Sequence, residues 1–272
     1  MTAETAQKVG KCAVVLGARG GTGKNIVFRL CERAPDEIAE IRAVVRNKGR
    51  SADEEKALLF PKSDDRVKLI FGDVLDLDSL RPAFTAAHYI FNAISGSGSR
   101  NAKVIEQTDR DAVGSTAMLL AQEFSHSLER YVLVSSQFVH PSNKWHHVRI
   151  MLNTLVTGPF ASKGIMDYKW EGEVLLRKAG IPYTIVRPGH LIDGPKNSIG
   201  KEKKVLVAQT NASLGNPTTR FVVAGVCVAA AMSERAKNTT FELGTDKSQE
   251  ESCIPEDLFD NLKPHFLEEE SK

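Results

Sequence analysis

The chain has 272 residues, and its 42% hydrophobic and 26% charged residues are proportions typical of a folded globular protein. Its 36 lysine and arginine residues against 34 aspartate and glutamate residues leave a formal charge of +2. Such a small charge excludes the strong positive field of a typical nucleic-acid-binding protein, so we expect small-molecule partners and no nucleic acid.

The cysteines are far apart and include no Cys-x-x-Cys pair, which argues against a disulfide framework; they are Cys12, Cys31, Cys227 and Cys253. The longest apolar stretch, near Phe221–Met232, is far shorter than the roughly 20 residues of a membrane span. We therefore expect a protein of a reducing compartment with no membrane span. The cytoplasm is the first expectation, and an organelle stroma or matrix after removal of a transit peptide is the alternative.

Short apolar runs alternate with segments of helical periodicity along most of the chain. Six runs are typical of buried strands: Lys11–Leu16, Ile41–Arg46, Arg66–Phe71, His88–Ala93, Arg130–Ser136 and Pro182–Arg187. Between them, Thr22–Arg33 and Asp111–Phe124 carry apolar residues at helical spacing. This alternation predicts an α/β fold, a doubly wound parallel sheet of the Rossmann type, with ligands outside the carboxyl ends of the strands.

The alternation becomes less regular after Pro188. There we expect a helix at Phe221–Met232, a strand at Thr239–Gly244 and a terminal helix at Pro255–Leu267. The basic run Lys201–Lys204 is interpreted as a solvated turn, or else as a contact for an anionic substrate.

No stretch of the sequence resembles a linker long enough to divide the chain. We therefore expect a single domain over residues 1–272. Within it, residues 11–188 form the dinucleotide-binding core, and residues 189–272 form a small C-terminal region on the substrate side. We expect this domain to act as a monomer or a homodimer.

A glycine-rich turn follows the first predicted strand and opens the first predicted helix; it consists of Gly17, Ala18, Arg19, Gly20, Gly21, Thr22 and Gly23. Glycines three residues apart allow a sharp bend, close approach of a diphosphate, and packing of the helix on the strand. The positive end of the helix adds attraction for an anion. The turn therefore predicts a dinucleotide site, and a tight turn without a ligand is the alternative.

Gly23 and Lys24 also resemble the end of a nucleoside-triphosphate loop. That pattern requires a glycine where Ala18 stands and a serine or threonine where Asn25 stands. We therefore reject the triphosphate interpretation.

The choice between NAD and NADP depends on the end of the second strand, where NAD-binding proteins carry an acidic residue. Here the residue is Arg46, and Arg19 in the glycine turn can flank the same position. Because arginine pairs with phosphate, this pattern predicts a preference for NADP(H) over NAD(H). A solvated charge at the end of the strand is the alternative interpretation of Arg46.

With these features, the chain resembles the atypical, extended-type short-chain dehydrogenase/reductases, near the NmrA-like and plant NAD(P)-binding Rossmann branch. The resemblance covers nearly the whole chain. The motifs that carry it are Gly17–Gly23, Val45-Arg46, Phe71-Gly72-Asp73, Asn92-Ala93, Val134-Ser135-Ser136, Lys169 with Glu173, Tyr183–Gly189 and Arg220.

The resemblance implies further cofactor contacts outside the turn: Asp73, Val74, Asn92, Ala93, Pro188 and Gly189. Asp73 and Val74 would lie beside the adenine, although Asp73 could instead cap a helix that begins near Asp78. The asparagine–alanine pair would lie beside the ribose and nicotinamide. The proline–glycine pair would flank the nicotinamide, and the proline could equally end a strand.

The resemblance also implies a serine, a tyrosine and a lysine that act together during hydride transfer. Ser136 matches the serine and Lys169 the lysine, but the tyrosine position, one helical turn before the lysine, holds Ile165. Tyr168 points about 100° away from Lys169 on a helix, so we interpret it as a packing residue. The absent phenol puts carbonyl reduction and sugar-nucleotide epimerisation in doubt.

Histidines in and after the segment from Gln137 to Lys163 are candidate substrate contacts. We expect this segment to cover the nicotinamide, with His140 as a donor, or else as a solvated loop histidine. His190 follows the proline–glycine pair and is the second substrate candidate. Adjacent His146 and His147 cannot readily converge on one ion, so we expect no metal.

Two functions compete. The first is an NADPH-dependent oxidoreductase without the active-site tyrosine, acting on a small electrophile of the quinone, flavin or enone type. The second is a non-catalytic NADP(H)-binding protein that senses redox state or serves as a scaffold. An epimerase or dehydratase is a third and weaker alternative.

Overall fold

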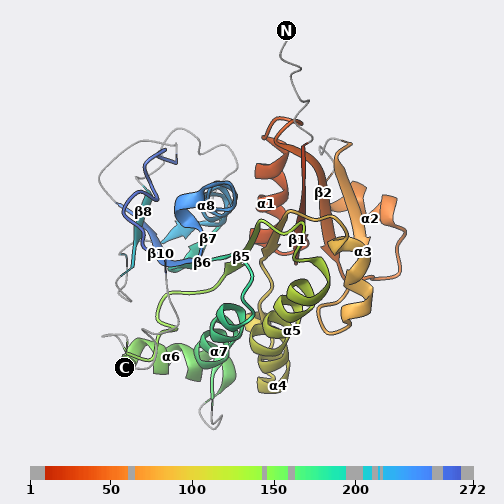
Figure 1. Cartoon of the computed structure of the whole chain (residues 1–272). Helices are drawn as coiled ribbons and strands as arrows, with labels where there is room; N and C mark the ends of the chain where they lie inside the picture. The colour runs from red at the N-terminus through yellow and green to blue at the C-terminus, as the bar shows by residue number, and fades with distance from the viewer. Residues whose placement is uncertain are drawn as a thin grey trace.

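The computed structural model describes residues 10–60, 65–142, 146–158, 163–193, 205–209, 214, 217–246 and 254–264. Its central element is an eight-stranded sheet in the order β3-β2-β1-β4-β5-β6-β10-β8 (Figure 1). The strands are β1 Lys11–Leu16, β2 Ile38–Val45, β3 Val67–Phe71, β4 Tyr89–Asn92, β5 Arg130–Val134, β6 Tyr183–Pro188, β8 Val205–Ala208 and β10 Thr239–Thr245.

All neighbouring strands in this sheet run parallel except β8, which pairs antiparallel with β10. The strand order reverses between β1 and β4, which are hydrogen-bonded neighbours. In doubly wound sheets this reversal opens a crevice at the carboxyl ends of the strands, where ligands bind. The predicted fold class is therefore confirmed.

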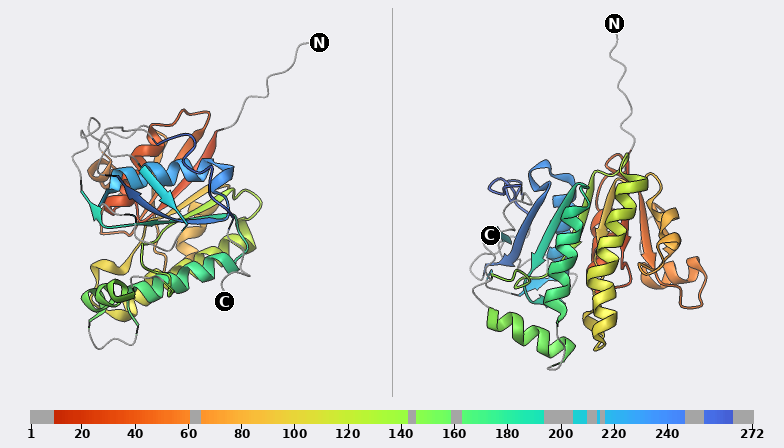
Figure 2. Two further views of the ribbon diagram at one scale, coloured as in Figure 1. Left: turned by 90° about the vertical axis from the view of Figure 1, so that its left-hand side faces the viewer. Right: turned by 60° about the horizontal axis from the view of Figure 1, so that its bottom comes forward.

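Helices cover both faces of the sheet (Figure 2). One face carries α1 Gly21–Cys31, α2 Ala52–Leu59 and α8 Arg220–Met232, and the other carries α3 Arg81–Phe84, α4 Ala102–Glu106, α5 Ala112–Leu119 and α7 Ile165–Lys178. Helix α6, His146–Thr157, packs against α7 on the side away from the sheet.

Strand β1 illustrates how the sequence builds this three-layer core. Its side chains alternate between the faces, so Ala13 and Val15 join the apolar cluster under α1 and α8. Val14 and Leu16 join the cluster under α3, α5 and α7. A strand that is buried on both faces must be apolar throughout, which is why the six strand runs were recognisable.

The helix that contains α5 is longer than the sequence predicts. The structure extends it from Ala102 to Phe124 and includes two wide π-helical segments, η3 at Gln107–Asp111 and η4 at Leu120–Phe124. The predicted start at Asp111 was wrong because polar residues dominate the first two turns, where little of the helix is buried.

Two of the three C-terminal elements are confirmed: α8 matches the predicted helix, and β10 matches the predicted strand and extends the sheet beside β6. The terminal helix predicted at Pro255–Leu267 is wrong over its described part. There the backbone N–H of Leu258 bonds to the carbonyl of Pro255, and Leu262 to Phe259, a turn spacing instead of a helical one. Lys201–Lys204 lies outside the described residues.

The region between β6 and α8 contributes a small second sheet. Strand β7, Leu191–Ile192, leaves the carboxyl end of β6 and pairs with β9, Thr218–Thr219, which leads directly into α8. Helix α8 therefore begins at the carboxyl edge of the large sheet, as α1 does, and runs toward the amino edge.

Candidate cofactor and active site

The glycine-rich turn joins β1 to α1 beside the end of β4, where the strand order reverses. Gly17 has a φ of +76°, a conformation that favours glycine, and its carbonyl oxygen accepts a hydrogen bond of 2.9 Å from the N–H of Gly20. A Cβ on Gly23 would lie 2.3 Å from the same carbonyl oxygen. Only glycine therefore lets α1 begin this close to the strand, and the N-terminal amides of such a helix can bind an anion.

The end of β4 borders this turn directly. A Cβ on Gly17 would lie 3.2 Å from the carbonyl oxygen of Ala93, so the structure brings these two predicted cofactor residues together. The neighbouring Asn92 is 2% exposed, and its amide donates to the Tyr131 hydroxyl at 2.8 Å and accepts from the N–H of Ile94 at 3.0 Å. Asn92 therefore fixes the loop after β4 from within.

Three arginines gather around the end of β2, and we call Arg19, Arg46 and Arg50 the arginine cluster. Arg46 follows β2 directly and is exposed, and its carbonyl oxygen accepts a hydrogen bond of 3.2 Å from Arg19. The buried carboxylate of Glu55, on α2, pairs with Arg19 and lies 3.5 Å from Arg50. Glu55 follows the Ser51–Glu54 capping box and belongs to no motif of its own, so the sequence gives no signal for it.

Asp73 and Val74 lie just beyond the end of β3. The Asp73 carboxylate accepts a hydrogen bond of 3.0 Å from the N–H of Leu75, and its own N–H donates to the Ser79 hydroxyl at 2.9 Å. The short helix that follows has Asp76 at its N-cap position, so Asp73 stabilises a local turn instead of capping that helix. Its position by the adenine stays a prediction.

Pro188 and Gly189 lie at the carboxyl end of β6. Pro188 pairs with Leu243 of β10, and its carbonyl oxygen accepts a hydrogen bond of 2.9 Å from the N–H of Gln137. Gly189 donates its N–H to the carbonyl of Leu243 at 3.2 Å. The pair therefore continues the sheet to its carboxyl edge, where the resemblance places the nicotinamide.

Lys169 points to the wide helical segment η3. Its ammonium lies 2.7 Å from one carboxylate oxygen of Asp109, and the other oxygen accepts a hydrogen bond of 2.7 Å from the N–H of Gly96. The Lys169 side chain is 10% exposed and that of Asp109 is 1% exposed. Asp109 thus joins the loop after β4 to α7, a role that its sequence position did not indicate.

The predicted tyrosine position is filled by apolar packing. Ile165 is 1% exposed and packs with Ile105, Val139 and Met166 in a small separate cluster. Tyr168 belongs to the same cluster, with the Arg110 guanidinium 6.0 Å from its ring, and burial raises the pKa of its phenol. The interpretation of Tyr168 as a packing residue agrees with this position.

A buried ionic network lies between α7 and the sheet. Glu173 receives hydrogen bonds from Arg187 at 2.6 and 3.0 Å, from Arg177 at 2.9 Å and from the Ser135 hydroxyl at 2.6 Å. Arg187 also pairs with Glu242 of β10 at 3.1 Å. Burial alone would raise the pKa of Glu173, but the two arginines outweigh it and lower that pKa to about 2. The network joins α7 to β5, β6 and β10.

The remaining candidate residues differ in their surroundings. Ser136 is half-buried and directly follows Ser135, whose hydroxyl belongs to the ionic network. The His140 ring lies edge-on to Trp170, with 4.5 Å between centroids, and its Nδ1 accepts a hydrogen bond of 3.2 Å from the backbone N–H of Ser142. His190 is exposed, and its carbonyl oxygen accepts the N–H of Thr218, which ties the first residues after β6 to β9.

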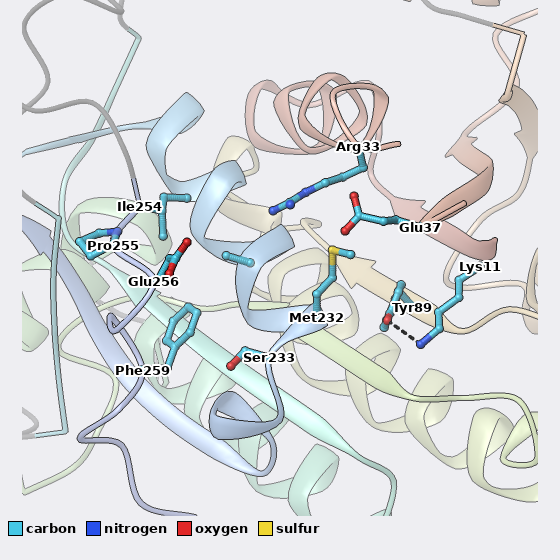
Figure 3. A pocket seen from close by; sticks show the side chains of 11 residues that line it. Lys11, Arg33, Glu37, Tyr89, Met232, Ser233, Ile254, Pro255, Glu256 and Phe259 are labelled. Atoms are coloured by element: carbon cyan, nitrogen blue, oxygen red, sulfur yellow. Dashed lines mark hydrogen bonds between the residues drawn. The ribbon is translucent and has the colours of Figure 1, made fainter. Parts of the chain in front are cut away.

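A cavity of about 510 Å³ lies elsewhere, at the amino edge of the sheet (Figure 3). Lys11 and Tyr89, joined by a 3.1 Å hydrogen bond, line one side of it, and Pro255 and Phe259 line the other. It contains none of the residues predicted for the cofactor or substrate. The described residues include no cluster of three or more potential metal ligands, and no helix among them is long and apolar enough to cross a bilayer.

Comparison with known proteins identifies the family. The model of the family described as NAD(P)H-binding matches residues 17–234. Among curated relatives, sanguinarine reductase of Eschscholzia californica is 23% identical over 260 residues, covering 86% of this chain and 89% of its own length. An uncharacterized chloroplastic protein of Arabidopsis thaliana is 26% identical over 277 residues, covering 96% of this chain and 85% of its own.

Solved structures show the same fold. A putative NAD-dependent epimerase/dehydratase from Bacillus halodurans has a TM-score of 0.64 at 19% identity, covering 87% of this chain and 95% of its own. A short-chain dehydrogenase/reductase from Veillonella parvula, solved in complex with NADP, has a TM-score of 0.62 at 17% identity, covering 90% and 98%. Because the family model covers residues 17–234, the chain belongs to this NAD(P)H-binding family.

Proposed function

We propose that this protein is an NADPH-dependent oxidoreductase that reduces a small electrophile of the quinone, flavin or enone type. The observation that carries the proposal is a complete glycine-rich turn combined with buried Ile165 at the position of the usual proton donor. The relative named sanguinarine reductase supports a reductase activity. The proposed substrates accept hydride to give delocalised anions, which water can protonate without a buried phenol.

The chain's own residues would position the reactants. The nicotinamide, when bound, supplies the hydride. Lys169 keeps one N–H on Asp109, so its other two N–H groups can hold the ribose hydroxyls. The Ser136 hydroxyl, two residues beyond β5, would orient a substrate oxygen.

The arginine cluster supports the preference for NADP(H). The buried Glu55 carboxylate pairs with Arg19, and Arg46 is exposed at the end of β2. No carboxylate stands at the Arg46 position to repel an adenosine 2′-phosphate. We therefore assign this phosphate to the arginine cluster.

The test is an acceptor panel. Purified protein is mixed with NADPH and with representative quinones, free flavins and enones, and the nicotinamide absorbance is followed over time. We expect turnover with at least one class, and a Ser136→Ala variant that binds NADPH normally but turns over more slowly. Binding of NADPH without turnover on any acceptor would contradict the proposed activity.

That contrary outcome would favour the second function, a non-catalytic redox sensor or scaffold. One contact supports this function: Lys169 pairs with the buried carboxylate of Asp109. The resemblance assigns this lysine to catalysis, but here the ion pair gives it a structural role. A sensor should capture a protein partner differently in its NADP⁺-bound and NADPH-bound forms. Equal capture in both forms would exclude sensing.

The compartment belongs to the proposal as well. We place the protein in the cytoplasm, with a plastid stroma as the alternative because a relative is chloroplastic. Imaging of the full-length chain fused to a fluorescent protein in its own cells distinguishes the two.

A further inference from the structure

Arg220, the first residue of α8, lies directly over the glycine-rich turn. A Cβ on Gly21 would be 2.7 Å from the Cδ of Arg220 and 3.1 Å from its Nε. Helices α1 and α8 pack side by side on the same face of the sheet, which brings their N-terminal ends together at the carboxyl edge (Figure 1). The Arg220 guanidinium is therefore next to the amides at the start of α1.

The position of this charge is unfavourable for α8 itself. A cation at the positive end of a helix dipole is opposed by roughly 0.3–1 kcal/mol, and the first turn of α8 contains no acidic residue that would offset it. In the described part of the chain, its charged partner is Asp193, at 2.7 Å. The Asp193 side chain is 87% exposed, so this ion pair contributes little to the free energy of folding.

We propose that Arg220 binds the diphosphate of the dinucleotide, which takes the place of the Asp193 carboxylate. This inference rests on the dinucleotide site of the proposed function. A diphosphate carries two negative charges and fits the forked guanidinium with two hydrogen bonds, so it competes successfully with a solvated aspartate. The ligand then lies between the amides of α1 on one side and Arg220 on the other.

The proposal separates two kinds of arginine. NADPH and NADH share the diphosphate, so loss of Arg220 weakens both cofactors by the same factor. Only NADPH carries the 2′-phosphate, so loss of Arg46 from the arginine cluster changes the ratio of the two affinities. Equal loss for both cofactors is therefore the signature of a diphosphate ligand.

The experiment measures the Kd of NADPH and of NADH by calorimetry for the wild type, Arg220→Gln and Arg220→Lys. We expect Arg220→Gln to raise both Kd values about tenfold, and Arg220→Lys to raise both by a smaller factor. Arg235→Gln is the matched control, because Arg235 lies just beyond the other end of α8, is 64% exposed, and carries the same charge. We expect it to leave both Kd values unchanged.

Asp193→Asn tests the exchange of partners. Without the Asp193 carboxylate, Arg220 is available to the ligand from the start. Both Kd values should therefore fall about twofold, a factor that corresponds to the small free energy of an exposed ion pair. Weaker binding by this variant would overturn the exchange.

Melting curves establish that each variant is folded before its Kd is interpreted, and Arg220→Lys retains the charge if Arg220→Gln unfolds. The proposal is overturned if Arg220→Gln binds both cofactors as the wild type does, if only its NADPH affinity falls, or if the wild type binds neither cofactor. Cofactor binding by the wild type without turnover defeats the proposed reductase activity alone. In that case an equal loss of both affinities still supports the diphosphate contact.

Discussion

At the β2 side of the carboxyl edge, charged side chains remain in contact with solvent: Arg46 is exposed, and Arg19 and Arg50 are 27% and 51% exposed. At the β5–β6 side, Glu173, Arg177 and the Arg187–Glu242 pair are at most 4% exposed and bind one another. Exposed cations are available to an incoming anion. Buried ones instead neutralise each other and fix the positions of the elements that carry them.

The largest expected effect comes from breaking the buried side. Glu173→Gln leaves Arg187 and Arg177 without their shared carboxylate, which should lower the free energy of unfolding by about 3–5 kcal/mol. In a chain of this size the melting temperature should fall by roughly 10 °C in calorimetry. The control is Glu171→Gln, two residues earlier on α7 and 29% exposed, which should cost less than about 1 kcal/mol. Equal melting of both variants would contradict a stabilising network.

The same network gives a pH dependence. Because the pKa of Glu173 is lowered from 4.5 to about 2, its charge stabilises the fold fully above pH 4.5, and this contribution is lost as the pH falls toward 2. Urea unfolding of the wild type and Glu173→Gln should therefore differ by a constant amount above pH 4.5 and by less at pH 3. A difference that is as large at pH 2 as at pH 7 would refute the assignment.

The next effect sharpens the comparison on the exposed side. Arg46→Asp replaces attraction of the 2′-phosphate by repulsion, so the Kd of NADPH should rise about 100-fold and that of NADH less than about threefold. Arg235→Asp makes the same change of charge at the amino edge and should leave the ratio unaltered. Titration of nicotinamide fluorescence measures both constants, and an unchanged preference would remove the arginine cluster from the site.

A smaller effect is expected for Lys169, whose exposed fraction lies between those of the arginine cluster and of the buried network. Lys169→Ala leaves the buried Asp109 carboxylate without its ammonium, so we expect a loss of about 1–3 kcal/mol in stability together with slower turnover. The double variant Asp109→Asn with Lys169→Ala should recover stability without recovering turnover. Full recovery of turnover would show that the lysine serves only to neutralise Asp109.

The smallest effect is expected at Ser51, on the β2 side of the sheet. Ser51 caps α2, the helix that carries Glu55, and its hydroxyl accepts the N–H of Glu54 at 3.3 Å. Ser51→Ala should lower stability by about 1 kcal/mol, measured by urea unfolding. Ser97→Ala, an exposed serine in the loop after β4, should have no measurable effect. If both variants are equally stable, the cap does not stabilise α2.

The same division explains what the sequence could predict. The glycine-rich turn and Arg46 lie within one continuous strand–helix–strand segment, so local spacing located them and the fold. Glu173, marked only by the resemblance, is 38 positions from its hydrogen-bond donor Ser135, and Lys169 is 60 positions from Asp109. No periodicity connects residues so far apart, and their contacts depend on how α7 packs against the sheet.

The errors have related causes. The apolar residues of the terminal segment recur at helical spacing, yet Ile254 and Phe259 pack on the core through a series of turns. Periodicity reports which side chains are buried, and it does not distinguish a helix from turns that bury the same residues. Ile165 was located from its spacing before Lys169, but its role as a packing residue became visible only with Ile105 and Val139 beside it.

The wide segment η3 has a consequence for comparing this chain with its relatives. A π-helical turn holds about one residue more than an α-helical turn, and such turns often stand at functional sites. Deleting one residue from Gln107–Asp111 would restore a regular helix but rotate one side of the segment by about 100° relative to the other. Asp109 could then not face both Gly96 and Lys169. Alignments should therefore allow a one-residue gap inside this helix, and relatives that show the gap should also lack an acidic partner for the lysine.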